Sequence, residues 1–297
     1  MKVLLTGGSG QIGFEVQRAI APVAELVAPG FGGLPRLELA DFAAVESLVA
    51  AVGPDLVINA AAYTAVDKAE SEPALAALIN AEAPGVLARA AARLSAPMIH
   101  YSTDYVFDGS GVAPWREEDA AHPLNVYGVN KLAGEIAVRA ANPHHLILRT
   151  SWVYSSRGIN FARTMLRLAG ERETLQVVND QFGAPTAAGL VADATVQAAR
   201  HAARTSQLYG TYHLVASGET SWHDYAAFLL RGAFEHDLID RLPRLEAVIS
   251  EQFPTPANRP KNSRLCNEKF ARGFDFSLPD WRLGVEQLIA TLAKAAM

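Results

Sequence analysis

Residues 2–13 read KVLLTGGSGQIG, a short apolar run that passes into a glycine-rich turn. Ile12, Val16 and Ile20 then recur at four-residue spacing, as on the buried face of a helix. The stretch therefore predicts a strand, a tight turn and a helix in direct succession.

The glycines of this turn have a physical use. Positions 7, 10 and 13 match the spacing of short-chain reductases, and positions 8, 10 and 13 also fit G-x-G-x-x-G. A turn without Cβ atoms lets the backbone approach a pyrophosphate, and the helix amino terminus offers unpaired N–H groups. A glycine turn alone can also bind nothing, but its place between strand and helix favours dinucleotide binding.

Further short apolar runs follow at residues 25–28, 55–59, 98–102 and 145–149, with alanine- and leucine-rich helical stretches between them. Such alternation is typical of a parallel sheet wrapped by helices. It predicts an α/β fold with a Rossmann-type doubly wound parallel sheet, whose strands end at one shared crevice.

The alternation weakens after about residue 150, where proline and glycine become more frequent. We therefore expect an NADP(H)-binding Rossmann domain over residues 1–150. Residues 175–205, with a helix over 189–203, are expected to return to it. Residues 151–174 and 206–297 are expected to form a smaller mixed α/β domain that binds the substrate.

Composition limits the possible partners. Of 297 residues, 50% are hydrophobic and 19% charged, enough for a full core and about two domains. No apolar run approaches the roughly 20 residues that span a bilayer, and no charged-then-apolar leader opens the chain, so we expect a cytoplasmic protein. A net charge of -5 with scattered lysine and arginine argues against nucleic acid and membranes. Cys266 is a single cysteine and the histidines lack zinc spacing, which leaves a small molecule as the expected partner.

The chemistry is predicted from a second motif, in which Tyr127 and Lys131 lie four residues apart and so share one helical face. A phenol has a pKa near 10, and a neighbouring ammonium favours its ionised form. Tyr-x-x-x-Lys alone also occurs by chance on helix surfaces. Thr103, at the end of the fourth apolar run, adds a hydroxyl about two dozen residues earlier that can bond a substrate carbonyl. That combination is the arrangement of short-chain reductases.

Two segments allow two interpretations each. The small residues after Asn59, over 60–62, would let a ribose or nicotinamide lie against the backbone, or would let a helix pack closely on the sheet. Trp152, just beyond the strand at 145–149, would stack on a sugar or join the two domains.

Across nearly its whole length the sequence resembles the dTDP-4-dehydrorhamnose reductases, a family of the extended short-chain dehydrogenase class. The motifs that carry the resemblance are residues 7–13, 59–70, HYSTDYVF at 100–107, PLNVYG at 123–128, RTSWVY at 149–154, NDQFGAPT at 179–186, YHLVASG at 212–218 and RPKNSRL at 259–265.

The resemblance implies reduction of the C4 keto group of dTDP-4-dehydro-L-rhamnose to dTDP-L-rhamnose, the last step of dTDP-rhamnose biosynthesis, at the expense of NADPH. It implies a catalytic set of Thr103, Tyr127 and Lys131, and sugar contacts from Thr103, Asp104 and Trp152. Arg259 and Asn262 would hold the nucleotide phosphates. The cofactor would be bound by Tyr127 and Lys131 and by Gly7, Gly10, Gln11, Ile12, Gly13, Asp41, Phe42, Ala62, Tyr63 and Thr64. The nucleotide carrier and the 6-deoxyhexose stay open at this point.

The second strand bears on the choice of dinucleotide. An NAD site usually has an acid there that binds the ribose 2′-hydroxyl. The run 26–30 reads LVAPG and carries no carboxylate. We therefore expect NADPH to serve at least as well as NADH, with Arg36 as a candidate for the 2′-phosphate.

Two other functions remain in view. One is a nucleotide-sugar epimerase or dehydratase that keeps its cofactor. The other is a non-catalytic NADP-binding subunit like the regulatory β subunit of methionine adenosyltransferase. Intact Thr103, Tyr127 and Lys131 favour an enzyme.

Metal binding is the point where the sequence departs from some relatives, in which acidic residues of two subunits hold Mg²⁺ at a dimer interface. Glu15 matches one of these acids, but residues 187–190 (AAGL) and 289–292 (IATL) carry none. Although Asp193 or Glu286 could substitute from a neighbouring turn, we expect no bound metal and a monomer or metal-independent homodimer.

Overall fold

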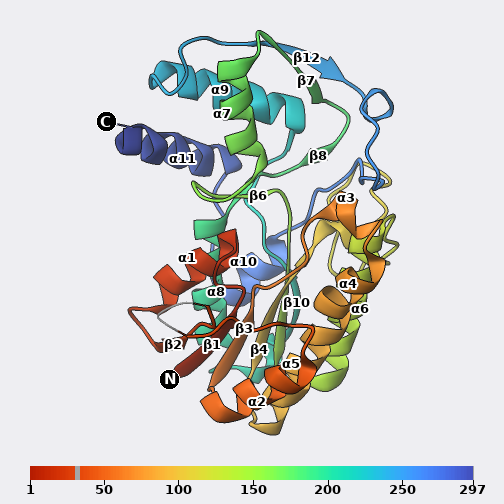
Figure 1. Cartoon of the computed structure of the whole chain (residues 1–297), viewed down its shortest axis with the longest axis vertical. Coiled ribbons are helices and arrows are strands. Elements are labelled where there is room, and N and C mark those ends of the chain that lie inside the picture. The colour runs from red at the N-terminus through yellow and green to blue at the C-terminus, as the bar shows by residue number, and fades with distance from the viewer. Residues whose placement is uncertain (31–33, 297) are drawn as a thin grey trace.

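A six-stranded parallel sheet forms the centre of the computed structural model, which describes residues 1–30 and 34–296 (Figure 1). Its strand order is β10-β5-β4-β3-β1-β2, so the order reverses direction between β1 and β3. The strands are β1 (Lys2–Thr6), β2 (Glu25–Val27), β3 (Leu56–Asn59), β4 (Met98–Thr103), β5 (His145–Thr150) and β10 (Gly210–His213). The predicted α/β class and doubly wound parallel sheet are confirmed.

Both faces of this sheet are covered by helices, because the central strands are apolar on both sides. Two consecutive residues of β4 show this: Ile99 lies in the core beneath α1 and α8, and Met98 in the core beneath α2 and α5. The helices of the first face are α1 (Gln11–Ile20), α8 (Ala188–Ala202) and α10 (Glu268–Phe274). Those of the second are α2 (Phe42–Val52), α5 (Ala83–Arg93) and α6 (Val126–Ala141), with the short α3 (Val66–Ala69) and α4 (Pro73–Ala77) beside them.

A second core lies above the sheet in Figure 1. It is built by α7 (Phe161–Glu171), α9 (Trp222–Glu235) and α11 (Trp281–Ala296) around a parallel pair of strands, β7 (Thr174–Val178) and β12 (Arg244–Val248). Short strand pairs tie it to the sheet: β6 (Val153–Tyr154) with β9 (Thr186–Ala187), and β8 (Phe182–Gly183) with β11 (Thr220–Ser221).

After the first five strands, the chain returns to the large sheet with α8 and β10, and again with α10. The helix predicted over 189–203 is α8, which packs against α1. The start of the segment 175–205, expected to return with it, lies instead in the second core as β7, paired with β12. The prediction that all of 206–297 belongs to the smaller domain is wrong for two segments. β10 pairs with β5, and Phe270 and Phe274 of α10 lie in the core of the sheet. The polar sequence of β10, GTYH, gave no apolar run by which to predict a strand.

Among the described residues, no helix is both long and apolar enough to cross a membrane.

Candidate active site

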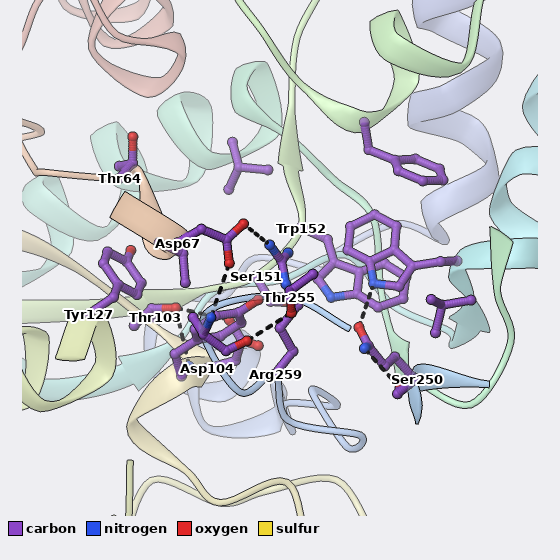
Figure 2. A pocket seen from close by; sticks show the side chains of 18 of the residues that line it. Thr64, Asp67, Thr103, Asp104, Tyr127, Ser151, Trp152, Ser250, Thr255 and Arg259 are labelled. Atoms are coloured by element: carbon purple, nitrogen blue, oxygen red, sulfur yellow. Dashed lines mark hydrogen bonds and ion pairs between the residues drawn. The ribbon is translucent and has the colours of Figure 1, made fainter. Parts of the chain in front are cut away.

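A cavity of about 1650 Å³ lies between the carboxyl ends of the large sheet and the second core. Its lining includes Tyr101 and Ser151 from the sheet side, and Phe161 and Trp222 from the second core. Pockets for a single drug-sized ligand usually measure about 300–1,000 Å³. The volume is therefore suited to two ligands bound together. Figure 2 shows Thr103, Asp104 and Tyr127 grouped in one part of the cavity, and Trp152 and Ser250 in another.

The glycine turn lies where the strand order reverses, the usual binding position in such sheets. Gly7 has a φ of +75° and packs so closely on Ala60 and Ala61 that a Cβ would overlap their backbone. A Cβ on Gly13 would overlap the carbonyl oxygen of Gly7. Glycine is thus required at both positions by close backbone contacts.

The start of α1 is open to the cavity. Gly10, the residue before the helix, makes no side-chain capping bond, and Gly10, Gln11 and Ile12 line the cavity. A ten-residue helix with uncapped N–H groups offers its positive dipole end to an anion. The turn and α1 together form a cradle that fits the pyrophosphate of a dinucleotide.

The other predicted cofactor residues differ in position. Ala62 and Thr64 line the cavity, whereas the Tyr63 hydroxyl donates to Glu72 at 2.6 Å and does not line it. Asp41 caps α2 by accepting from the Ala44 N–H at 3.0 Å, and Phe42 packs against the core beneath that helix. Neither Asp41 nor Phe42 lines the cavity. Of the small residues at 60–62, Ala60 and Ala61 pack closely on Gly7, and Ala60 and Ala62 line the cavity, so room for a ribose or nicotinamide along this backbone stays a prediction.

Thr103 and Tyr127 are brought together by the start of α6. The Asn125 side chain caps this helix by accepting from the Gly128 N–H at 2.8 Å. Gly128 lies against Tyr105, where a Cβ would overlap the Tyr105 carbonyl oxygen. This close approach sets the first turn of α6 beside the end of β4. Thr103, Tyr127 and Lys131 consequently all line the cavity, although the first comes from β4 and the others from α6.

Burial controls the titration of the two α6 residues. Lys131 is 2% exposed, its Nζ donates to the Tyr101 carbonyl at 2.6 Å, and burial lowers its pKa to about 8. The pKa of Tyr127 is raised by burial and by Asp104, and Thr103 opposes the rise. The phenol pKa is therefore raised in this structure, and not lowered as the pairing of Tyr127 with Lys131 predicted. At neutral pH the phenol carries its proton, as a proton donor must.

Asp104, directly after Thr103, is also buried. Its Oδ1 accepts from the Thr103 hydroxyl at 2.9 Å, and its Oδ2 has no hydrogen-bond partner in the described part of the chain. Burial raises the Asp104 pKa to about 6, although hydrogen bonds from Ser263 and Thr103 oppose the rise. The Asp104 Oδ2 is therefore a buried acceptor without a partner in the described residues, on a side chain that lines the cavity.

Trp152 combines an unusual backbone conformation with close packing on two sides of its indole. Its backbone has a φ of +49°, uncommon for a bulky residue. Its indole stacks on Trp222 with ring centroids 3.6 Å apart, and a Cβ on Gly183 would come within 2.8 Å of the indole. Trp152 also lines the cavity, so it both joins the second core to the sheet and faces the ligand space.

Of the two residues expected at the nucleotide phosphates, Arg259 and Asn262, only the first lines the cavity. Arg259 lines the cavity and pairs with Asp67 at 2.9 Å (Figure 2). Asn262 is 1% exposed, does not line the cavity, and its amide donates to the Ala113 carbonyl at 2.8 Å. Its position gives no support to a ligand contact.

Several cavity residues were missed by the sequence analysis. Lys261 lines the cavity and pairs with Asp180 and Glu251, each at 2.9 Å. The Trp222 indole N–H donates to Gln181 at 3.2 Å, whose amide donates to Ser250 at 3.1 Å. Sequence alone signals the helix start at Trp222, because a capping serine precedes it, but not its stacking on Trp152.

Comparison with known proteins agrees with this geometry. The family model described as the RmlD substrate binding domain matches residues 1–294. The dTDP-4-dehydrorhamnose reductases of Salmonella typhimurium and Escherichia coli K12 are each 52% identical, with 98% of both chains covered. The chain belongs to this reductase family.

Solved structures place the fold in the same family. The dTDP-4-dehydrorhamnose reductase of Clostridium acetobutylicum superposes with a TM-score of 0.89 at 36% identity, covering 98% of this chain and 99% of that one. The Bacillus anthracis reductase in complex with NADP gives a TM-score of 0.86 at 33% identity, with the same coverage. A UDP-glucose 4-epimerase from Thermus thermophilus shares the fold at 19% identity and a TM-score of 0.79, covering all of both chains.

Glu15, the acid that matches the metal-binding position of some relatives, is already paired with an arginine. The Arg18 guanidinium bonds Glu15 and Asp193, each at 2.8 Å, and so lies between the two carboxylates. In the described part of the chain no three metal-binding side chains of the His, Cys, Asp or Glu type come together.

Proposed function

We propose that this chain catalyses the NADPH-dependent reduction of the C4 keto group of dTDP-4-dehydro-L-rhamnose, giving dTDP-L-rhamnose. The observation that carries the proposal is that Thr103, Tyr127 and Lys131 line one cavity together with the glycine cradle at the start of α1. Relatives 52% identical that bear the name of this reductase support the substrate class.

The bound cofactor supplies a hydride to the carbonyl carbon. Tyr127 donates its phenolic proton to the oxygen as that oxygen gains negative charge. Thr103, at the end of β4, donates a hydrogen bond to the same oxygen and fixes its position. General acid catalysis of this kind typically contributes about 10²–10⁴-fold, and positioning of both reactants in the cavity adds more.

Lys131 assists after the proton has left. With a pKa of about 8 the lysine is mostly an ammonium at neutral pH, and that charge stabilises the phenolate that Tyr127 becomes. Its bond to the Tyr101 carbonyl holds the ammonium at the cavity wall. We also propose that it bonds the nicotinamide ribose.

NADPH is the expected cofactor because the run after β2 has no acid to bind a ribose 2′-hydroxyl. Arg36, exposed in the connection from β2 to α2, is the proposed partner of the 2′-phosphate. The Bacillus anthracis relative, solved with NADP, supports this assignment.

On the substrate side, Asp104 and Trp152 are proposed to contact the sugar, and Arg259 the nucleotide phosphates. Asn262 is left out of this set. We further propose a cytoplasmic enzyme that acts as a monomer or a metal-independent homodimer.

The test is NADPH oxidation by the purified protein, supplied with the C3,C5-epimerised dTDP-4-keto-6-deoxy sugar. Stoichiometric conversion of NADPH and sugar is the expected result. Isomerised sugar without net NADPH consumption would identify an epimerase. Binding of NADPH without turnover would identify a regulatory subunit.

A further inference from the structure

A row of buried polar side chains crosses the sheet from the glycine turn to the catalytic lysine. Thr6 ends β1, Asn59 ends β3, His100 is central in β4, and Lys131 comes from α6. The Thr6 hydroxyl lies 2.6 Å from Asn59 Oδ1, Asn59 Nδ2 lies 3.1 Å from His100 Nδ1, and His100 Nε2 lies 3.4 Å from Lys131 Nζ. All four side chains are 2% exposed or less.

The orientation of the Asn59 amide is fixed by two donors. Its Oδ1 accepts from the Thr6 hydroxyl and from the Ala61 backbone N–H at 3.2 Å. A backbone N–H can only donate, so the atom facing it must be the amide oxygen. The Asn59 NH₂ group therefore faces His100, and His100 Nδ1 accepts from it.

It follows that the single proton of a neutral His100 ring lies on Nε2. The ring is neutral because burial and the nearby Lys131 charge hold the His100 pKa well below its usual range. The Nε2–H then faces the lysine nitrogen. A neutral amine accepts this N–H with its lone pair, whereas an ammonium presents a second N–H to it. The contact favours the neutral amine.

The remaining groups around Lys131 act differently. On α6, Tyr127 lies one turn before it, and Glu135 one turn after it, where the carboxylate favours the ammonium but is also paired with Arg149 at 2.8 Å. On β4 the Tyr101 carbonyl accepts from Nζ in either charge state. Asp104, beyond β4, acts on the phenol of Tyr127. His100 is thus the neighbour whose proton is directed at Nζ.

We infer that His100 is a positioning residue for Lys131, which uses an Nε2–H fixed by Asn59 and Thr6 to set how readily the lysine amine holds its proton. The inference deepens the proposed reductase function, on which it rests for its catalytic meaning. Through His100 and Asn59, the end of β1 that precedes the glycine turn is connected to Lys131. A histidine that only fills the core would leave the lysine pKa unchanged when replaced.

The first test needs no substrate. Nitrogen-15 NMR of histidine-labelled protein reports which ring nitrogen carries the proton, and the His100 signals are assigned by their loss in His100→Asn. We expect a neutral ring with the proton on Nε2 from about pH 6 to about pH 9. A proton on Nδ1, or an imidazolium in this range, would overturn the inference whether or not the enzyme reduces the proposed sugar.

The second test measures the lysine. His100→Asn keeps an acceptor for the Asn59 amide and removes the N–H that faces Nζ. Carbon-13 NMR of lysine-labelled protein should show the Lys131 pKa about one unit higher in this variant, a tenfold change in proton affinity.

The matched control is His213→Asn, because His213 is equally buried on β10 but contacts the Trp115 carbonyl at 3.1 Å. This control should leave the Lys131 pKa in place. An unchanged or lower Lys131 pKa in His100→Asn, or an equal rise in His213→Asn, would refute the role of His100. If His100→Asn does not fold, His100→Gln takes its place both for the assignment of the ring signals and for the lysine titration, with the same expected and contradicting results.

Discussion

Gly128→Ala tests how the start of α6 sets the catalytic geometry. The added Cβ would overlap the Tyr105 carbonyl oxygen and come within 3.0 Å of Pro123 Cβ, so α6 must move on the order of 1 Å to restore van der Waals contact. Overpacking of this kind costs about 1–3 kcal/mol, and the better helix propensity of alanine returns about 1 kcal/mol. We expect a net loss of about 0–2 kcal/mol in the free energy of unfolding.

The loss of turnover should be larger than that loss of stability suggests. Tyr127 directly precedes Gly128, and a misplacement of about 1 Å can cost about 100-fold in rate. The assays are urea unfolding, kcat for NADPH oxidation, and the Kd for NADPH. Gly170→Ala in α7 is the control, because nothing lies within 4 Å of its added Cβ, and it should leave kcat unchanged. Wild-type kcat and stability in Gly128→Ala would refute the reasoning.

Three further predictions follow from charge and burial. Asp104 has a folded-state pKa raised to about 6, so its protonated form stabilises the fold, and this stability is lost as pH rises from about 4 through about 6. Asp104→Asn should remove a pH-dependent difference on the order of 3 kcal/mol at most, measured by urea unfolding at the two ends of that range; the same pH slope in both proteins would contradict it. Arg36→Ser should raise the KM for NADPH about tenfold, because a charge-assisted bond to the 2′-phosphate is lost, and should leave the KM for NADH unchanged. Equal effects on the KM of both cofactors would exclude this contact. Since Arg18 already bridges Glu15 and Asp193, EDTA should change neither turnover nor sedimentation, and a loss of activity or of a dimer that Mg²⁺ restores would show that other acids build a metal site.

The sheet was largely predictable because five of its strands are short apolar runs, of which β1, β3, β4 and β5 are buried along nearly their whole length. β10 was not, because its sequence GTYH resembles a polar loop and becomes a strand only through pairing with β5. The role of α10 was hidden for a related reason. Its Phe270 and Phe274 could belong to either core until the chain path is known.

The residues of the candidate site also fall into those that the sequence predicted and those that it did not. Thr103, Tyr127 and Lys131 were predictable because each belongs to a short motif tied to one strand or helix. Trp222 and Lys261 were not, since their cavity positions depend on contacts between distant segments. Within the motif at 259–265, Arg259 and Lys261 line the cavity, whereas Asn262 faces into the protein.

The most direct test of the account is the turnover of Tyr127→Phe, which removes the proton donor and keeps the ring. With the dTDP-4-keto-6-deoxy sugar as substrate, we predict that kcat for NADPH oxidation falls by at least about 100-fold while NADPH binds as in the wild type. A folded variant that keeps near-normal kcat would contradict the assignment of Tyr127 as the proton donor.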